Sequence, residues 1–136
     1  MRIMLDTNIL VSAIFFPSPQ TRRFIREVSG KHGLLLCDYV IEELRLVVER
    51  KFPGKKTALE QFFLELPFGL IHTPREIDVG NFPSVRDRKD SPILATAILE
   101  NVDVFVTGDK DFLVLELEVP EILTMAEFLE RYAPPE

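Results

Sequence analysis

The sequence predicts an α/β fold, a three-layer α/β/α sandwich with a central parallel sheet. Short apolar segments alternate with amphipathic segments along the whole chain, which is the pattern of β-strands joined by helices. Residues 1–6 and 103–107 are too apolar for half-exposed strands and are typical of strands covered on both faces. The chain has 136 residues, of which 46% are hydrophobic and 28% charged, so residues 1–136 are expected to form one globular domain.

Five strands are expected in the chain, near residues 1–6, 34–37, 70–72, 103–107 and 122–123. Helices are expected over residues 8–15, 21–29, 39–52, 57–66, from 91 onward, and 125–132. Residues 74–89 are polar and contain proline, which predicts a long loop.

Several helix ends have recognisable signals. Thr21 and Asp38 are expected to cap helices, and Gly30 is expected to end one. Two segments, TALE at residues 57–60 and TMAE at residues 124–127, have the capping-box form, in which a Thr and a Glu three residues later satisfy the first N–H groups of a helix.

Charge and composition exclude several classes of protein. The net charge of −6 argues against nucleic-acid binding through a uniformly basic surface, but it allows an enzyme whose acids surround metal ions. The single cysteine, Cys37, is expected to be a small buried hydrophobic residue. No apolar segment approaches the roughly 18 residues of a membrane span, and Asp6 interrupts the only N-terminal one. A cytoplasmic protein without membrane association is expected.

Four acidic residues lie at the edges of expected elements: Asp6, Glu43, Asp90 and Asp109. Ligands of parallel sheets bind at the carboxyl ends of the strands, where Asp6 and Asp109 are expected. Several carboxylates that lie close together repel one another unless cations lie between them. Mg²⁺ or Mn²⁺ prefers such oxygen ligands, and zinc is not expected because the chain has no pair of cysteines. We therefore expect an acidic site that holds Mg²⁺ or Mn²⁺ against a phosphodiester and supports its hydrolysis.

Each of these acids also has a simpler structural interpretation. Asp6 and Asp90 are typical N-caps, and Asp109 and Asp111 are typical of turns. Glu43 lies at the margin of the apolar stripe of its helix, close to buried surface, whereas Glu42 lies almost opposite that stripe. The simpler interpretation of Glu43 is a salt bridge with Arg50.

Four motifs, taken together, resemble the PIN-domain ribonucleases. They are LDTNILVSA at residues 5–13, EELRLVV from residue 42, DSPILATA at residues 90–97 and FVTGDKDF at residues 105–112. They follow the order of that family and span nearly the whole chain. The chain is most similar to the small prokaryotic PIN proteins that are toxin components of toxin–antitoxin pairs (VapC-like). The resemblance implies a parallel sheet flanked by helices and cleavage of RNA with Mg²⁺ or Mn²⁺.

The resemblance also assigns residues and partners. Asp6, Glu43, Asp90 and Asp109 match the catalytic, metal-binding acids, and Asp111 is a further metal ligand where the family varies. Asn8 and Thr107 match polar positions that hydrogen-bond within the site. Glu42 and Asp87 offer alternative registers, but Glu43 and Asp90 fit the motifs better. The implied partners are an RNA substrate and an antitoxin protein.

Two further surfaces are expected from residue type. RNA needs positive charge outside the acids, and the candidates are Arg22, Arg23, Arg26, Arg86, Arg88 and Lys89, although a solvated helix face or loop explains them as well. A homodimer surface is expected from a set of apolar residues that a monomer core explains equally well: Phe62, Phe63, Leu66, Phe128 and Leu129.

Two other function classes remain open. One is a non-catalytic interaction domain, which has no need of clustered carboxylates. The other is a phosphate-accepting regulatory domain with a phosphorylated Asp at a strand end. Such a domain needs a Lys at the end of a late strand, whereas Lys110 comes three residues after Thr107.

Overall fold

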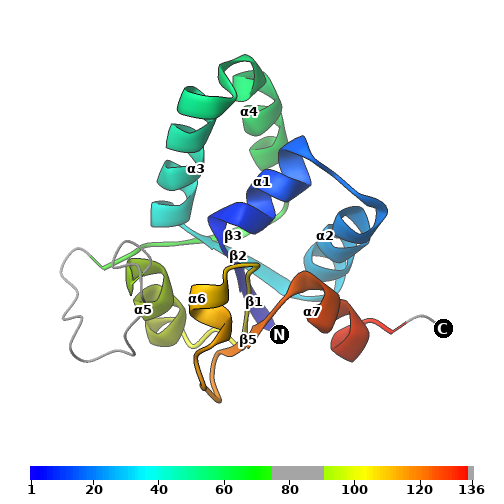
Figure 1. The fold of residues 1–136 in the computed structure, drawn as a ribbon, viewed down its shortest axis with the longest axis vertical. Coiled ribbons are helices and arrows are strands. Elements are labelled where there is room, and N and C mark those ends of the chain that lie inside the picture. The colour runs from blue at the N-terminus through cyan, green and yellow to red at the C-terminus, as the bar shows by residue number, and fades with distance from the viewer. Residues whose placement is uncertain (75–90, 135–136) are drawn as a thin grey trace.

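The computed structural model describes residues 1–74 and 91–134 of the chain. Five strands form one sheet in the order β3-β2-β1-β4-β5, and every neighbouring pair is parallel (Figure 1). The predicted α/β class with a central parallel sheet is confirmed. The strands are β1 (Arg2–Leu5), β2 (Gly33–Cys37), β3 (Gly69–Ile71), β4 (Val104–Val106) and β5 (Glu121–Leu123).

The described helices connect these strands. Their bounds are α1 (Thr7–Phe15), α2 (Pro19–Lys31), α3 (Asp38–Lys51), the 3₁₀ turn η1 (Pro53–Lys55), α4 (Lys56–Glu65), α5 (Ser91–Leu99), α6 (Lys110–Leu113) and α7 (Met125–Tyr132). None of the helices in the described ranges is both long enough and apolar enough to cross a membrane.

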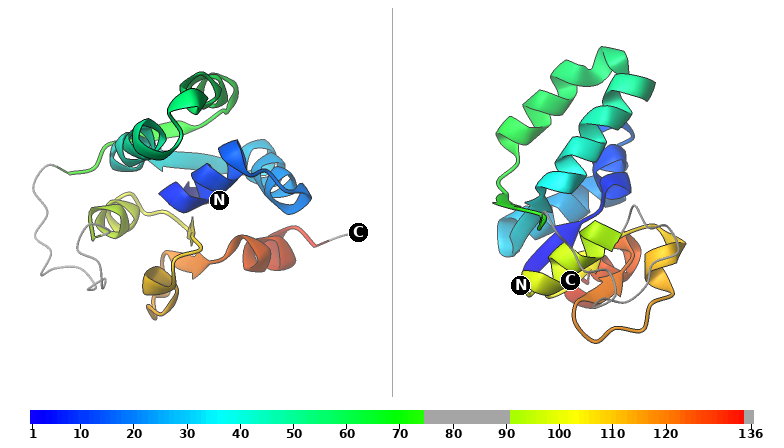
Figure 2. Two further views of the ribbon diagram at one scale, coloured as in Figure 1. Left: turned by 45° about the horizontal axis from the view of Figure 1, so that its top comes forward. Right: turned by 90° about the vertical axis from the view of Figure 1, so that its left-hand side faces the viewer.

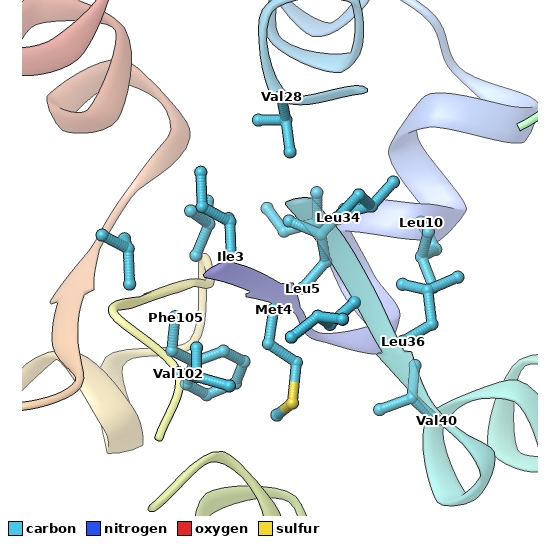
Figure 3. Close-up of a cluster of buried hydrophobic side chains, with 14 of the residues drawn as sticks. Ile3, Met4, Leu5, Leu10, Val28, Leu34, Leu36, Val40, Val102 and Phe105 are labelled. Carbon is cyan, nitrogen blue, oxygen red and sulfur yellow. The ribbon is translucent and has the colours of Figure 1, made fainter. Parts of the chain in front are cut away.

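The central strand β1 is covered on both faces. Ile3, Met4 and Leu5 are all fully buried, and successive side chains of a strand point to opposite faces. Figure 3 shows Met4 on one side of β1 and Ile3 on the other. The same holds for β4, where Phe105 lies in the core and packs edge-to-face against Phe112, with 5.0 Å between the ring centroids. Both faces therefore need helices, which gives the three layers.

The strand order places the reversal of the chain between β1 and β4. From β1 the chain moves outward to β2 and β3, and it then returns to the other side of β1 for β4 and β5. Leu5 of β1 is paired with Val106 of β4, so the two strands end at the same level. A crevice outside the carboxyl ends of two such strands is where open α/β sheets bind ligands.

Helices α3 and α4 form an antiparallel pair that extends away from the rest of the molecule (Figures 1 and 2). Helix α1 contacts α3 at both ends. Thr7 is hydrogen-bonded to Glu43, and the ring of Phe15 stacks on that of Phe52, with 4.9 Å between centroids. The two helices therefore run in the same direction, with their first turns at the carboxyl edge of the sheet.

Some expected helix boundaries are wrong. Ser18, not Thr21, caps α2 and accepts the N–H of Thr21, and the helix continues through Gly30 to Lys31. Asp38 is the first residue of α3 rather than its cap. The short helix α6 occupies a segment that was expected to be a turn.

The prediction of a dimer surface is wrong for three of the five residues on which it was based. Leu66, Phe128 and Leu129 are buried within the chain, and Phe62 and Phe63 are partly buried against the same core. The monomer-core interpretation therefore explains these residues. Cys37 is fully buried, as expected.

The two capping-box sequences have different outcomes. Thr124 caps α7 with both reciprocal hydrogen bonds to Glu127 in place, whereas Thr57 lies inside α4, whose N-cap is Lys55. We predict that Thr124→Ala lowers the free energy of unfolding by about 1 kcal/mol, because the cap bond is lost. Thr57→Ala is the control and leaves stability unchanged or slightly raised, because Ala is the better helix former. Urea unfolding measures both, and equal losses would contradict the prediction.

Candidate active site at the carboxyl ends of β1 and β4

The site begins with Asp6, which directly follows β1. Asp6 is the N-cap of α1, and its Oδ1 accepts the N–H of Ile9 at 3.1 Å. Its Oδ2 accepts a hydrogen bond from the hydroxyl of Thr107, the residue that directly follows β4. Both carboxylate oxygens are therefore held, one by the helix that starts at the site and one by the neighbouring strand. The side chain is only 4% exposed.

Thr107 connects Asp6 to a second acid. While its hydroxyl donates to Asp6, the same oxygen accepts the N–H of Asp109 at 3.0 Å. Asp109 is in turn the N-cap of α6, and its Oδ1 accepts the N–H of Asp111 at 2.9 Å. Thr107 was expected to hydrogen-bond within the site, and it does so by connecting the carboxylate of Asp6 to the backbone N–H of Asp109.

Glu43 reaches the same place from the second turn of α3. Its Oε1 accepts a hydrogen bond from the hydroxyl of Thr7, the first residue of α1. Glu43 is half-buried whereas Glu42 is exposed, in agreement with the helical geometry that favoured Glu43. Within the described residues Glu43 forms its hydrogen bond with Thr7 and no ion pair with Arg50.

These three acids line one small cavity of about 30 Å³. Its walls are Asp6, Thr7, Asn8, Glu43, Ile93, Asp109 and Phe112. The cavity lies where the strand order reverses, and Ile93 and Phe112 give it an apolar side. Asn8, expected as a supporting polar residue, lies on the wall, whereas Asp111 lies beside it in the first turn of α6.

Comparison with known proteins identifies the family. A model of the PIN domain matches residues 2–111, which is most of the chain and includes Asp6, Glu43 and Asp109. The chain belongs to the PIN domain family. No curated protein matches the sequence.

A solved structure shares the fold of this PIN domain. The crystal structure of VapBC2 from Rickettsia felis bound to a DNA fragment from their promoter matches with a TM-score of 0.68. The match covers 90% of this chain and 97% of that chain, at 22% sequence identity. The arrangement of strands and helices is thus that of a chain in the VapBC2 structure.

The donor set of this PIN domain suits a hard divalent cation. Asp6, Glu43 and Asp109 supply only oxygen ligands, and a cavity of about 30 Å³ has room for an ion or a water. In residues 1–74 and 91–134, however, no three His, Cys, Asp or Glu side chains already lie close enough to hold a metal. Asp90, the fourth expected acid, and its alternative Asp87 lie outside the described residues.

The expected RNA-binding cations are only partly described. Arg22 and Arg26 are exposed on α2. The guanidinium of Arg23 donates to the carbonyl of Ala133, just beyond the C-terminal end of α7. That end lies at the amino edge of the sheet, because Arg131 of α7 pairs with Glu121 at the start of β5. Arg23 is therefore directed away from the acids. Arg86, Arg88 and Lys89 lie outside the described residues.

Thr7 is a site residue that sequence reasoning missed. Its hydroxyl donates to the carboxylate of Glu43 and holds it in place. The pairing joins residues 36 positions apart, so no local pattern could reveal it.

Burial controls the ionisation of Asp6. The pKa of Asp6 is raised to about 6, mainly by desolvation and to a smaller extent by the charge of Asp109, against the opposing effect of the hydrogen bonds from Thr107 and Ile9. Because the folded-state pKa lies above that of the unfolded chain, folding favours the neutral carboxyl. That contribution to stability is complete below about pH 4 and is lost as the pH rises through about 6.

Asp6→Asn is therefore expected to stabilise the metal-free protein at pH 8. The gain is about 1–3 kcal/mol, because an ionised buried carboxylate is replaced by a neutral amide. The gain disappears near pH 4, where Asp6 is already neutral. Urea unfolding in the presence of EDTA at the two pH values measures it, and a destabilised variant at pH 8 would contradict the prediction.

Asp38 is a control because its pKa is shifted in the opposite direction from that of Asp6. Partial burial raises the pKa of Asp38, but hydrogen bonds from Thr73, His72 and Tyr39 together hold it below its ordinary value. The ionised form therefore stabilises the fold above the unfolded pKa and is lost in acid. Asp38→Asn is expected to destabilise the protein at pH 8 and to have no effect at low pH.

Thr7 is expected to position Glu43 for metal binding. Thr7→Val keeps the shape of the side chain but removes the hydroxyl, and it should weaken Mn²⁺ affinity by about 10–100-fold, as loss of an outer hydrogen-bond partner does. Thr7→Ser keeps the hydroxyl and should restore the affinity. Titration calorimetry with MnCl₂ measures both, and equal affinities for the Val and Ser variants would show that the hydroxyl has no role.

Proposed function

We propose that this PIN domain is a metal-dependent endoribonuclease and the toxin component of a toxin–antitoxin pair. The observation that carries the proposal is that Asp6, Glu43 and Asp109 line one cavity at the switch point of a parallel sheet. They come from three segments far apart in the sequence. PIN domains as a class are nucleases, and oxygen-only donor sets bind Mg²⁺ or Mn²⁺.

The residues have different roles in the proposed reaction. Asp6 and Asp90 are the proposed principal metal ligands, and Glu43 and Asp109 complete the set directly or through water. A divalent cation bound there supplies positive charge to the phosphate and lowers the pKa of water. Thr107 fixes the orientation of Asp6 and of the backbone N–H of Asp109. Thr7 fixes Glu43.

The raised pKa of Asp6 is expected to make metal binding depend on pH. In the metal-free protein Asp6 is partly protonated near pH 6, whereas a metal ligand must be ionised. Metal binding therefore competes with this proton, and affinity for Mn²⁺ is expected to rise with pH across this range. Ile93 and Phe112 add apolar surface to the walls, which lowers the local polarity beside the acids.

The toxin assignment has a separate basis from the nuclease assignment. One similar solved structure is that of VapBC2 from Rickettsia felis bound to a DNA fragment from their promoter. We propose an antitoxin protein as the partner of this chain by analogy with that complex. RNA as the substrate, and the cytoplasm as the place of action, are part of the same proposal.

The nuclease proposal is tested with two glutamates of α3. Glu43→Gln removes a proposed ligand and should lower Mn²⁺-dependent cleavage of a labelled RNA by more than about 100-fold, which exceeds the loss typical of residues that only hydrogen-bond to a ligand. Glu49→Gln removes the same charge from an exposed residue that does not line the acidic cavity and should retain cleavage. Gel analysis of the products measures both.

The result also separates the two leading function classes. An unmodified chain that binds Mn²⁺ but cleaves no RNA would contradict the proposed ribonuclease activity. Such a chain would favour the non-catalytic interaction domain. Equal loss in both Glu variants would show that charge alone, and not the site, matters.

A further inference from the structure

We propose that the C-terminal ends of α1 and α3 form a second binding subsite, which holds single-stranded RNA beyond the acidic cavity. This inference rests on the proposed nuclease function. The subsite, here called the aromatic–basic end, consists of Phe16 after α1 and of Phe52 with the cations that flank it in the sequence, Arg50, Lys51, Lys55 and Lys56. None of these residues belongs to the acidic cavity.

The first observation is an exposed aromatic surface. Phe16 is 63% exposed although it is a large apolar side chain. Its ring packs edge-to-face against Phe52 at 5.9 Å between centroids, and Phe52 also stacks on Phe15 at 4.9 Å. Phe52 therefore holds Phe16 and is itself held by Phe15, while most of the Phe16 side chain remains exposed. Accessible aromatic rings of this kind stack on the bases of single-stranded nucleic acids.

The second observation is positive charge in an acidic protein. Residues 50–56, RKFPGKK, contain four of the chain's 16 Lys and Arg residues and no acid. Lys51, Lys55 and Lys56 are exposed. Across the described residues, none of these three lysines forms an ion pair. The combination of exposed aromatic rings and unpaired cations is complementary to a phosphate backbone with unstacked bases.

The third observation is continuity with the acidic cavity. A groove of about 400 Å³ follows α3, with Glu42 and Glu43 at one end, Leu46 and Val47 between, and Arg50 and Lys51 at the other. Glu43 also lines the cavity, so the groove leads from the proposed metal site to the basic segment. Phe52 directly follows Lys51 at the end of α3.

The two helices set the separation of the subsites. Phe16 lies nine residues beyond Thr7, which is about 14 Å along a helix at 1.5 Å per residue. This is the length of about four stacked nucleotides, or of fewer in an extended strand. A strand whose scissile phosphate lies at the acids therefore reaches the aromatic–basic end a few nucleotides away. A dinucleotide is too short to do so.

The binding test uses a chain that cannot cut its ligand. A fluorescent 12-nucleotide single-stranded RNA is titrated with the Glu43→Gln protein in MnCl₂, and anisotropy reports the affinity. Adding Phe16→Ala and Lys51→Ala should weaken binding by about tenfold or more. The plot of log affinity against log salt should become less steep by about 0.7 for the lost lysine. The matched control, Leu64→Ala with Lys31→Ala, removes an exposed apolar residue and an exposed cation elsewhere and should leave affinity unchanged.

A length comparison tests the position of the subsite. In the active chain, Phe16→Ala with Lys51→Ala should lower kcat/KM for the 12-nucleotide RNA by about tenfold and leave cleavage of a dinucleotide unchanged. Lys51→Gln with Lys55→Gln changes only exposed side chains, so a folding defect is not expected to obscure the result. This second variant should lower cleavage of the longer RNA as well.

Each outcome decides the proposal. Equal affinity and equal cleavage in the variants would overturn the subsite while the nuclease stands. RNA binding that depends on Phe16 and Lys51 in a chain without cleavage activity would support the subsite while the nuclease fails. Unchanged RNA affinity together with lost binding to poly-glutamate would show that this end binds an acidic protein segment, and the RNA subsite would be wrong.

Discussion

The buried carboxylate of Asp6 is the interaction on which the site depends. One oxygen caps α1, and the other is held by Thr107 at the end of β4. The pairing of β1 with β4 brings these residues together, so the carboxylate is fixed only where the two strands are paired. Burial makes the ionised form unfavourable, which is the reason for the raised pKa of Asp6. A cation in the cavity would offset the cost of burying the ionised carboxylate. The same burial therefore lowers stability in the absence of metal and favours an ionised Asp6 paired with a cation.

Capping and ligand roles do not exclude each other in this protein. Asp6 caps α1 and Asp109 caps α6, yet both carboxylates line the cavity. A cap fixes the carboxylate relative to a helix N-terminus, and the backbone N–H groups there provide positive electrostatic potential. The cap hydrogen bonds therefore give the acids a defined orientation before any ligand arrives. The capping role of these acids is therefore part of how the site is built.

The pair of helices α1 and α3 connects the two ends of the proposed RNA path. Thr7 and Glu43 join the helices at the sheet edge, and Phe15 and Phe52 join them at the far end. Because both contacts lie on the same rigid pair, the separation between the acids and the aromatic–basic end is fixed by helix geometry. In this proposal the overall acidic charge does not prevent RNA binding, since four cations without an intervening acid lie at one end of that pair.

The α/β class could be predicted without a structure, because the alternation of apolar strands and amphipathic helices is a local pattern. The sequence also separated Glu43 from Glu42, since the 3.6-residue period of a helix relates each position to the buried face. It identified the cap of α7 but predicted the same cap wrongly at Thr57. The 3₁₀ turn Pro53–Lys55 leads directly into α4, so the helix begins at Lys56 and its N-cap is Lys55. Thr57 is therefore not the cap, although TALE has the same capping-box form as TMAE.

Which distant residues contact one another could not be predicted from local patterns. The strand order, the link from Thr107 to Asp6 and the contact of Thr7 with Glu43 all join segments far apart in the chain. Such contacts depend on how strands pair and helices pack, and neighbouring residues do not encode them individually. The contact of Phe16 with Phe52 is of the same kind, because it joins the ends of two helices that are far apart in the chain.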